Sequence, residues 1–512
     1  MKIVNKLRLS YIFVAALMAI LVGVACGGGD DDQSAGKQGG TLRVAIAADN
    51  NTLDPAMTLS GADREFTMTT YDNLVLRQHD LSLKPMLATS WEPSADLTSY
   101  TFNLRKGVKF HHGKEFNADD VVFTFKRLLD EATGSPARSA LSSIKDVVKI
   151  DDLTVRFDTN SPDAFLADTL SLYQGRILPS DIDPSRFATE EFGTGPFIME
   201  EYIPGERAVF NRNPDYWEDG RPYLDKVIFY YMPEPETRLE ALKTGSIDVV
   251  HELPAVAVDV LAANPGTTYS EAASSSYLNL ALDMTQEPFT DKRVRQAFQA
   301  AFDREAIQKA SLFGRGIIAS DTTIPPTDPH YDSSQPIPAY DIEKAKKLLA
   351  EAGYPDGIDI TLHTSTVTGG MVEMAVAYKE SAAPAGIRVE INRAPEDAYW
   401  SKVWMTEAFT TVGWNGRNPD QALSIVYLCD ADWNESRICI DELDALIIKA
   451  RGETDLEERK KLYAETQRIL IDDASRLIAV FRPIFIGLSD KVKGIDAHPN
   501  NWLIVSQGWL EE

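Results

Sequence analysis

Three cysteines are the residues of this 512-residue sequence best suited to covalent chemistry. Cys429 and Cys439 stand ten residues apart in a polar segment, without histidine partners at the spacing of a zinc site. Where the compartment permits oxidation, a disulfide is the natural pairing, and two free thiols are the alternative. On the chain-entropy model, closing so short a loop stabilises a fold by roughly 3 kcal/mol. Cys26 stands apart from this pair, directly after an apolar run.

Motifs of hydrolytic catalysis are absent from the sequence. It contains neither a Gly-x-Ser-x-Gly nucleophile elbow nor a His-Glu-x-x-His zinc helix. His111 and His112 fall in a predicted hairpin turn, where we expect both to be solvated, and the other histidines are scattered singly. We therefore expect no enzymatic activity, no metal and no cofactor. An exported hydrolase is the competing class, because a chain of this length could hold one.

The first 25 residues have the pattern of an export signal. They carry Lys2, Lys6 and Arg8 but no acidic residue, followed by an apolar run from Ile12 to Ala25. That run is shorter than the roughly 20 residues that a helix needs to cross a bilayer, and no later run is longer. We expect residues 1–25 to be a signal peptide and the mature chain to be soluble.

The residues around Cys26 resemble a bacterial lipoprotein signal. Small residues, Gly23-Val24-Ala25, precede the cysteine, although the lipoprotein pattern prefers Leu where Gly23 stands. The resemblance implies lipidation of Cys26 and a place on the outer face of the cell membrane or in the periplasm, because two or more acyl chains hold a protein stably on a membrane. Cleavage nearby without lipidation is the alternative. The Gly- and Asp-rich residues 26–40 then form a flexible tether.

An excess of acidic residues disfavours one class of partner. The sequence has 77 Asp and Glu against 51 Lys and Arg, a formal net charge of −26. Nucleic acids are bound through clustered Lys and Arg, so we expect no nucleic-acid partner. The acidic residues are scattered, which is typical of a solvated surface that keeps a protein soluble.

Chain length and periodicity predict an α/β protein with at least two lobes. A single core rarely serves more than about 300 residues. Period-two alternation predicts strands at 41–46, 99–104 and 153–157, and a helix begins after Asn117, a favourable N-cap. The second half alternates helix and strand in the order typical of βαβ units. Its predicted helices are 341–352, 372–385 and 456–473, and its predicted strands are 358–362 and 387–391.

A run of motifs between Leu87 and Phe123 resembles a known family. It reads Leu-Ala-Thr-Ser-Trp-Glu-Pro at 87–93, continues through 100–113, and ends Phe-Asn-Ala-Asp-Asp-Val-Val-Phe at 116–123. This run is similar to the signature of the extracellular solute-binding proteins of the peptide and nickel importer class, family 5. Five further blocks follow the family order: Leu53–Pro55, Gly193–Phe197, Asn211–Trp217, Leu242–Asp248 and Val294–Glu305.

The resemblance implies a two-lobed periplasmic-binding-protein-like fold of type II, with an enlarged first lobe and the ligand enclosed in an interlobe cleft. Residues 41–280 would form the first lobe, with 486–512 returning to it, and residues 281–485 the second. The chain would cross between lobes near 275–290 and 480–490. Two crossing strands make a hinge, so closure over the ligand is the expected motion.

The function that the resemblance implies is the substrate-binding component of an ABC importer. Such a protein captures a solute reversibly and docks on the permease subunits of the membrane complex. We expect a peptide or peptide-like solute and a monomeric protein. Family members also bind sugars, opines and nickel chelates, and the same fold could serve a ligand sensor, so these remain alternatives.

One departure from the family concerns the ligand's amino end. Peptide binders of the family carry Gly-Trp and then, three residues after the Trp, an acid that anchors the α-ammonium group. Here Gly413-Trp414 is followed by Arg417 at that position, which replaces an anion with a permanent cation. Either Asp420 takes the ammonium group from a shifted loop, or the ligand presents an acid, or no charged end is recognised there. An ion pair between the lobes is a further interpretation of Arg417.

The predicted ligand-binding residues lie in two segments. Trp414 could offer a rigid aromatic wall to a ligand or could belong to the core. Asp49 and Asn50 follow the first strand, where the family often supplies polar contacts, although such residues also serve plain turns. The complete predicted set is Asp49, Asn50, Trp414, Asn415, Arg417, Asn418 and Asp420.

Overall fold

The computed structural model describes residues 36–511 of the chain. The predicted signal peptide and Cys26 lie outside the described residues. Within residues 36–511, no helix has both the length and the apolar character needed to cross a membrane.

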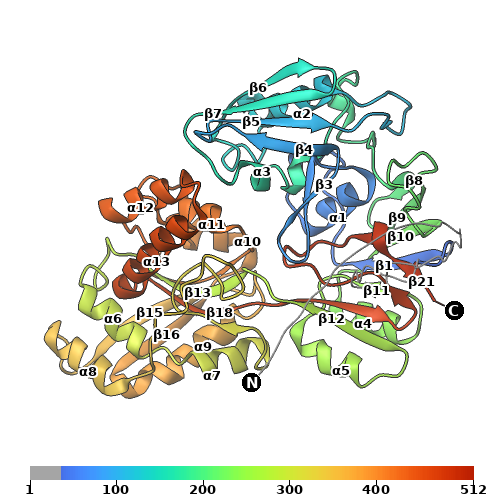
Figure 1. Ribbon diagram of the computed structural model, residues 1–512. Helices are drawn as coiled ribbons and strands as arrows, with labels where there is room; N and C mark the ends of the chain where they lie inside the picture. The colour runs from blue at the N-terminus through green and yellow to red at the C-terminus, as the bar shows by residue number, and fades with distance from the viewer. Residues whose placement is uncertain (1–35, 512) are drawn as a thin grey trace, which may run out of the picture. The chain divides into compact units, whose positions relative to one another are not determined.

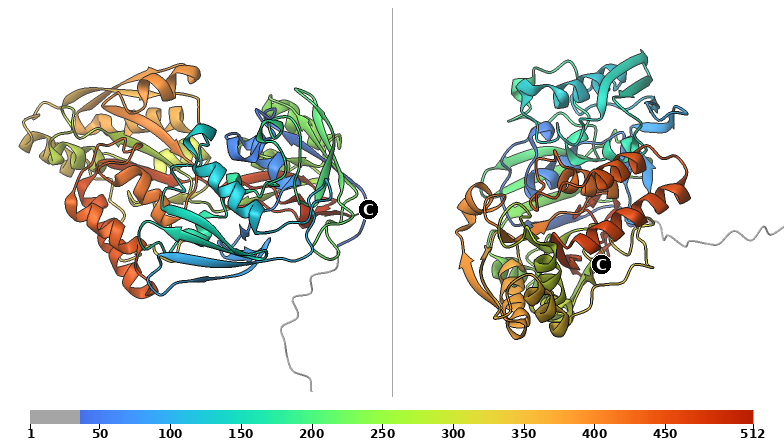
Figure 2. Two further views of the ribbon diagram at one scale, coloured as in Figure 1. Left: turned by 90° about the horizontal axis from the view of Figure 1, so that it is seen from above. Right: turned by 90° about the vertical axis from the view of Figure 1, so that its left-hand side faces the viewer.

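A seven-stranded mixed sheet joins segments from both ends of the described chain. Strand β1 pairs in parallel with β10 and β11, and β11 pairs antiparallel with β19, so the blue β1 and the red β19 lie in one sheet (Figure 1; Figure 2). Alternating apolar side chains of β1, such as Leu42 and Val44, are fully buried. In sheet order, the strands are β12 (Thr267–Ala272), β19 (Ile484–Ser489), β11 (Val249–Val250), β1 (Thr41–Ile46), β10 (Lys226–Tyr231), β9 (Arg207–Arg212) and β8 (Phe197–Ile203).

A six-stranded sheet organises the second half of the chain. Its order is β14-β18-β13-β17-β15-β16, and the parallel pair β15 and β16 is connected through α9, which confirms the predicted βαβ order. The strands are β13 (Tyr277–Leu282), β14 (Ile317–Ile318), β15 (Ile358–Thr364), β16 (Ile387–Arg393), β17 (Phe409–Trp414) and β18 (Arg476–Phe481). The helices packed around this sheet include α6 (Lys292–Ala300), α7 (Arg304–Leu312), α8 (Ile342–Glu351) and α9 (Met371–Ala382).

A smaller antiparallel sheet carries the family motifs. Asn117 caps α2 by accepting a hydrogen bond from the Asp119 N–H, and the Asn117 N–H donates one to Asp120 Oδ2. This capping box stabilises a helix start by about 1 kcal/mol. Phe125 of α2 then packs edge-on against Phe157 of the sheet, with ring centres 4.9 Å apart. The elements are β4 (Ala88–Pro93), β5 (Ser99–Leu104), α2 (Ala118–Leu129), β6 (Ile144–Asp151) and β7 (Thr154–Thr159).

The prediction that His111 is solvated is wrong. Its side chain is buried, with Nδ1 2.7 Å from Glu191 Oε1 and Nε2 3.0 Å from the Gly195 carbonyl oxygen. The loop around Gly193 and Gly195 folds back over the hairpin turn, a long-range packing that local turn chemistry does not indicate.

Two adjacent segments connect the large sheets. The chain leaves the seven-stranded sheet after β12, enters the six-stranded sheet at β13, and returns between β18 and β19. The two connections lie side by side, because the Arg482 N–H donates to the Ser276 carbonyl oxygen at 2.7 Å. We call residues 273–276 and 482–483 the crossing segments. The exact lobe boundaries stay a prediction.

Three helices and a disulfide complete the second half. Cys429 and Cys439 are joined, and this disulfide closes the loop between α11 (Pro419–Tyr427) and α12 (Asp441–Arg451). The predicted helix 456–473 is confirmed as α13 (Leu456–Asp473). The remaining helices and short strands are α1 (Gly61–Thr70), β2 (Val75–Arg77), β3 (Leu83–Pro85), α3 (Leu166–Thr169), α4 (Pro235–Lys243), α5 (Val258–Ala262), α10 (Glu396–Ala398), β20 (Val492–Lys493) and β21 (Trp509–Leu510).

Candidate functional site

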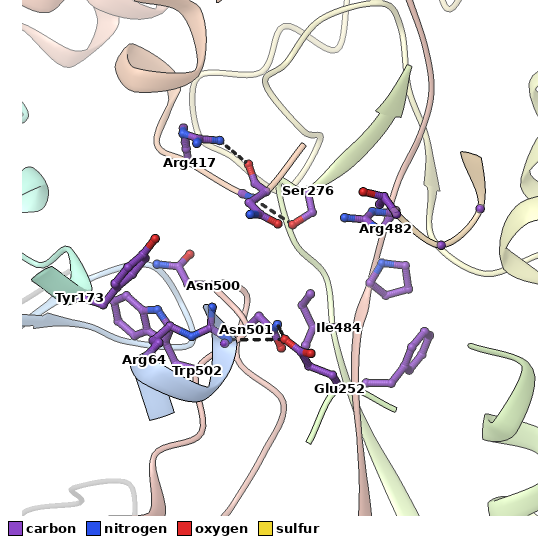
Figure 3. Close-up of a pocket in the computed structure, with 18 of the residues that line it drawn as sticks. Arg64, Tyr173, Glu252, Ser276, Arg417, Arg482, Ile484, Asn500, Asn501 and Trp502 are labelled. Carbon is purple, nitrogen blue, oxygen red and sulfur yellow. Dashed lines mark hydrogen bonds and ion pairs between the residues drawn. The ribbon is translucent and has the colours of Figure 1, made fainter. Parts of the chain in front are cut away.

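A cleft of about 970 Å³ opens beside the crossing segments (Figure 3). Its walls come from parts of the chain that are far apart in sequence. One wall contains α3, the turn at Tyr173, and the residues around Glu252 and Trp502; the other contains the end of α7, the turn before α9, and the loop after β17. Ser276 and Arg482 of the crossing segments also line it. The cleft therefore forms only when these distant segments pack together in the folded chain.

Three of the predicted ligand-binding residues line this cleft: Asn415, Arg417 and Asn418. All three belong to the loop between β17 and α11. Asn415 is exposed, whereas Asn418 is buried at the start of α11, where its side-chain oxygen accepts a hydrogen bond from the Gln421 N–H at 2.8 Å. The loop thus brings part of the predicted set together.

Trp414 lies behind the cleft wall. Its side chain is 6% exposed, stacks on Tyr277 with ring centres 6.4 Å apart, and packs among buried apolar residues. The indole Nε1 points to Glu435 Oε1 at 3.4 Å. Direct contact of Trp414 with a ligand stays a prediction, whereas its contribution to the core is observed.

Asp420, Asp49 and Asn50 also lie outside the cleft lining and have partners within the protein. Arg451 Nε lies 3.0 Å from Asp420 Oδ1, and burial raises the pKa of Asp420 to about 6. Asp49 accepts a hydrogen bond from the Tyr202 hydroxyl at 2.9 Å, and Asn50 Oδ1 accepts one from the Tyr231 hydroxyl at 2.8 Å. Ligand contact by these three residues stays a prediction.

Arg417 lies across two indole rings. Its guanidinium carbon is 5.3 Å from the Trp414 ring centre and 5.7 Å from that of Trp433, distances at which a cation is attracted to an aromatic face. Nη1 donates to the Asn415 carbonyl oxygen at 3.1 Å, and burial lowers the pKa of the guanidinium. Within residues 36–511, Arg417 makes no ion pair, so the interpretation as an ion pair between lobes finds no partner there.

Asn418 connects two walls of the cleft. Its Nδ2 donates to Asp168 Oδ2 at 2.5 Å, and the same carboxylate accepts a hydrogen bond from Arg77 Nε at 2.8 Å. Asp168 belongs to α3, whereas Asn418 begins α11. The Asp168 carboxylate is therefore already neutralised by Arg77 within the protein.

Comparison with known proteins decides the family. The description "Bacterial extracellular solute-binding proteins, family 5 Middle" matches residues 82–435. The chain belongs to this family. The heme-binding protein A of Haemophilus influenzae is 32% identical, with 94% of this chain and 95% of the relative covered. Di/tripeptide-binding protein 1 of Pseudomonas aeruginosa is also 32% identical, with 82% and 84% covered.

A solved structure supports the same assignment for the fold of this family 5 protein. The periplasmic binding protein DppA of Helicobacter pylori, in complex with the peptide STSA, superposes with a TM-score of 0.80 at 30% identity, and 93% of this chain and 99% of that chain are covered. The predicted family and the predicted two-lobed α/β fold are therefore confirmed. The family consists of binding proteins, not enzymes.

Several cleft residues of this family 5 protein lie in no motif that the sequence shows. Arg64 pairs with Glu65 at 2.9 Å and lies 3.6 Å from Glu252, whose Oε1 also accepts a hydrogen bond from Asn501 Nδ2 at 2.7 Å (Figure 3). No local motif marks these residues, because they approach one another only in the folded chain. Arg482 is an exception, since it lies in a region predicted to cross between lobes.

Proposed function

We propose that this family 5 protein captures a peptide or peptide-like solute in the cleft and delivers it to the permease subunits of an ABC importer. The observation that carries the proposal is the cleft beside the two crossing segments, with polar and apolar side chains on its walls. Its volume lies at the upper end of the range of roughly 300 to 1,000 Å³ typical of small-molecule sites, which leaves room for a short peptide.

Exposed apolar side chains at the cleft favour an organic ligand over a small inorganic ion. Leu59, Val256 and Phe313 line it and are 70%, 57% and 56% exposed, and Trp433 joins them. Exposed apolar groups gathered at a concave site gain about 25 cal/mol for each Å² that a ligand covers. Peptide side chains or a comparable organic solute would provide that cover.

The names of similar proteins support a peptide as the solute. Di/tripeptide-binding protein 1 of Pseudomonas aeruginosa and the DppA protein in complex with STSA are both named for peptides. The heme-binding protein A of Haemophilus influenzae is named for a different ligand, so non-peptide solutes belong in the test.

Delivery to a permease requires the protein to stay near the membrane. We propose that Cys26 is lipidated and that the residues after it act as a tether on the outer face of the membrane. The tether would end before Gln38 and Gly39, which form hydrogen bonds with Gly220 and Tyr223. The protein would act as a monomer. In this arrangement the crossing segments serve as the hinge, and ligand binding favours the closed form because both walls contact the ligand.

A thermal-shift screen tests the proposed function. The chain expressed from Gly36, which forms one compact unit, is heated with di- to pentapeptides, amino acids, nickel chelates, heme and oligosaccharides. A ligand at 100 times its dissociation constant adds about 2.7 kcal/mol of apparent stability. Stabilisation by peptides is the expected result. Stabilisation only by sugars, heme or chelates would refute the peptide and leave the importer function in place.

A further inference from the structure

Two arginines reach the cleft without a carboxylate partner. Within residues 36–511, neither Arg417 nor Arg482 forms an ion pair, whereas the other two cleft arginines are paired, Arg77 with Asp168 and Arg64 with Glu65. Figure 3 shows Arg417 and Arg482 on either side of Ser276. Neither guanidinium group is paired with a carboxylate, although the charge of Glu252 raises the pKa of Arg482 and so opposes part of the effect of burial.

Three consecutive serines hold both arginines in place. Ser275 Oγ accepts a hydrogen bond from the Arg417 N–H and donates one to the Arg417 carbonyl oxygen, both at 3.0 Å. The Arg482 carbonyl oxygen accepts a hydrogen bond from Ser274 Oγ at 2.8 Å, and the Arg482 N–H donates to the Ser276 carbonyl oxygen at 2.7 Å. One crossing segment therefore fixes the backbone of both residues, so their positions relative to the hinge are defined.

Both arginines are half-buried, and the guanidinium group of Arg417 lies against the rings of Trp414 and Trp433. Burial lowers the pKa of Arg482 to about 10, and its Nε atom is buried without a hydrogen-bond partner among the described residues. An unpaired, partly desolvated cation costs free energy that an opposite charge recovers. A carboxylate suits this position best, since it accepts two parallel hydrogen bonds from a guanidinium group.

The carboxylates of the cleft are already occupied, with one exception. Asp168 is bound by Arg77 and Asn418, and Glu252 lies near Arg64 and is bound by Asn501. Glu373 lines the cleft, is exposed, and has no hydrogen bond or ion pair among the described residues. A bound ligand therefore meets two available cations and one available anion.

We infer that the cleft selects peptides of net negative charge, with ligand carboxylates at Arg417 and at Arg482. This inference rests on the proposed function, because it specifies which peptides the site takes. A peptide with an acidic side chain supplies two carboxylates and one ammonium group, the complement of the free groups in the cleft. Arg417 then recognises an anion at the position where peptide binders of the family carry an acid.

Isothermal titration with three tripeptides tests this inference. Ala-Glu-Ala, Ala-Gln-Ala and Ala-Lys-Ala have similar backbones and differ in net charge. We expect Ala-Glu-Ala to bind about tenfold more tightly than Ala-Gln-Ala, since a charge-assisted hydrogen bond is worth at least that factor. Ala-Lys-Ala should bind most weakly. This ranking needs no variant, so it does not depend on whether a mutant folds.

Substitution of each arginine tests whether the preference for Ala-Glu-Ala comes from Arg417 and Arg482. We expect Arg417→Gln and Arg482→Gln each to weaken Ala-Glu-Ala binding about tenfold. Arg468→Gln, which removes the same charge from an exposed pair with Glu465 on α13, should leave the affinity unchanged. Thermal midpoints without ligand show that each variant is folded.

The outcomes separate the inference from the proposed function. If Ala-Gln-Ala or Ala-Lys-Ala binds as tightly as Ala-Glu-Ala, or if neither arginine variant changes the ranking, the charge selection is refuted while peptide binding stands. If no peptide of any charge binds, the proposed function fails and the inference fails with it.

Discussion

Glu435 is a buried carboxylate whose loss should lower the stability of the fold. It forms an ion pair with Arg476 in which both side chains are 1% exposed. The same carboxylate accepts hydrogen bonds from Trp404 Nε1 at 2.6 Å and Asn279 Nδ2 at 2.9 Å. Glu435→Gln keeps the size and one acceptor oxygen but removes the negative charge, so the Arg476 cation stays buried without its counter-charge.

The size of the effect follows from that uncompensated charge. Breaking a buried ion pair by changing one partner costs about 3 to 5 kcal/mol, of which the stranded charge is the main part. With an m-value of about 3 kcal/mol per molar, the urea midpoint should fall by roughly 1 to 1.7 M. Equilibrium unfolding in urea, followed by tryptophan fluorescence, measures this shift.

A matched control removes the same charge at the surface. Glu465 pairs with Arg468 at 2.9 Å on the exposed side of α13, so Glu465→Gln should cost less than about 1 kcal/mol. Arg476→Met combined with Glu435→Gln should recover part of the loss, because no buried charge then remains. If Glu435→Gln is no more destabilising than Glu465→Gln, the stranded-charge argument is wrong.

Three further predictions concern stability. Replacing Cys429 and Cys439 by Ser should lower the free energy of unfolding by about 3 kcal/mol, measured against the oxidised protein in urea. Burial raises the pKa of Asp420 to about 6, so between about pH 4 and 6 the folded chain keeps a proton on this carboxyl that the unfolded chain has lost. The free energy of unfolding should therefore fall as the pH rises over that range. Asp420→Asn should remove this contribution to the pH dependence, measured by urea unfolding at a series of pH values. Burial lowers the pKa of His498 to about 3, so the stability that its neutral form contributes is lost as the pH falls from about 6.5 towards 3. His498→Phe should therefore make the thermal midpoint less sensitive to acid. An unchanged pH profile of the thermal midpoint would contradict this role of His498.

Local sequence patterns were sufficient for most of the secondary structure. The strand at 41–46 and the helix at 456–473 have the predicted bounds, because alternation and capping depend on neighbouring residues. The family motifs predicted the fold class for a similar reason, since they lie in a hairpin and a capped helix. Boundaries elsewhere moved by one to three residues. Pairing with β16 extended β15 to Thr364, whereas α9 ends at Ala382 because a 3-10 turn with Pro384 follows it.

The site was less predictable, because residues distant in sequence create it. Tyr173, Glu252 and Trp502 line the cleft without any local motif. Trp414 is the reverse: a sequence motif predicted it as a ligand-binding residue, but its side chain is buried in the core. Its burial depends on Tyr277 and Glu435, and neither partner can be read from the sequence around residue 414.

The loop after β17 links the buried core to the proposed carboxylate site. At the start of the loop, the indole Nε1 of Trp414 donates a hydrogen bond to Glu435. At its end, Asn418 Nδ2 donates one to Asp168. Arg417 lies between these two points, against the faces of Trp414 and Trp433. An arginine held over aromatic faces loses less conformational entropy when it binds a carboxylate than one that moves freely, because its planar group is already oriented. In this arrangement Trp414 belongs to the core and supports the position of Arg417, which is how it would act on the proposed carboxylate site.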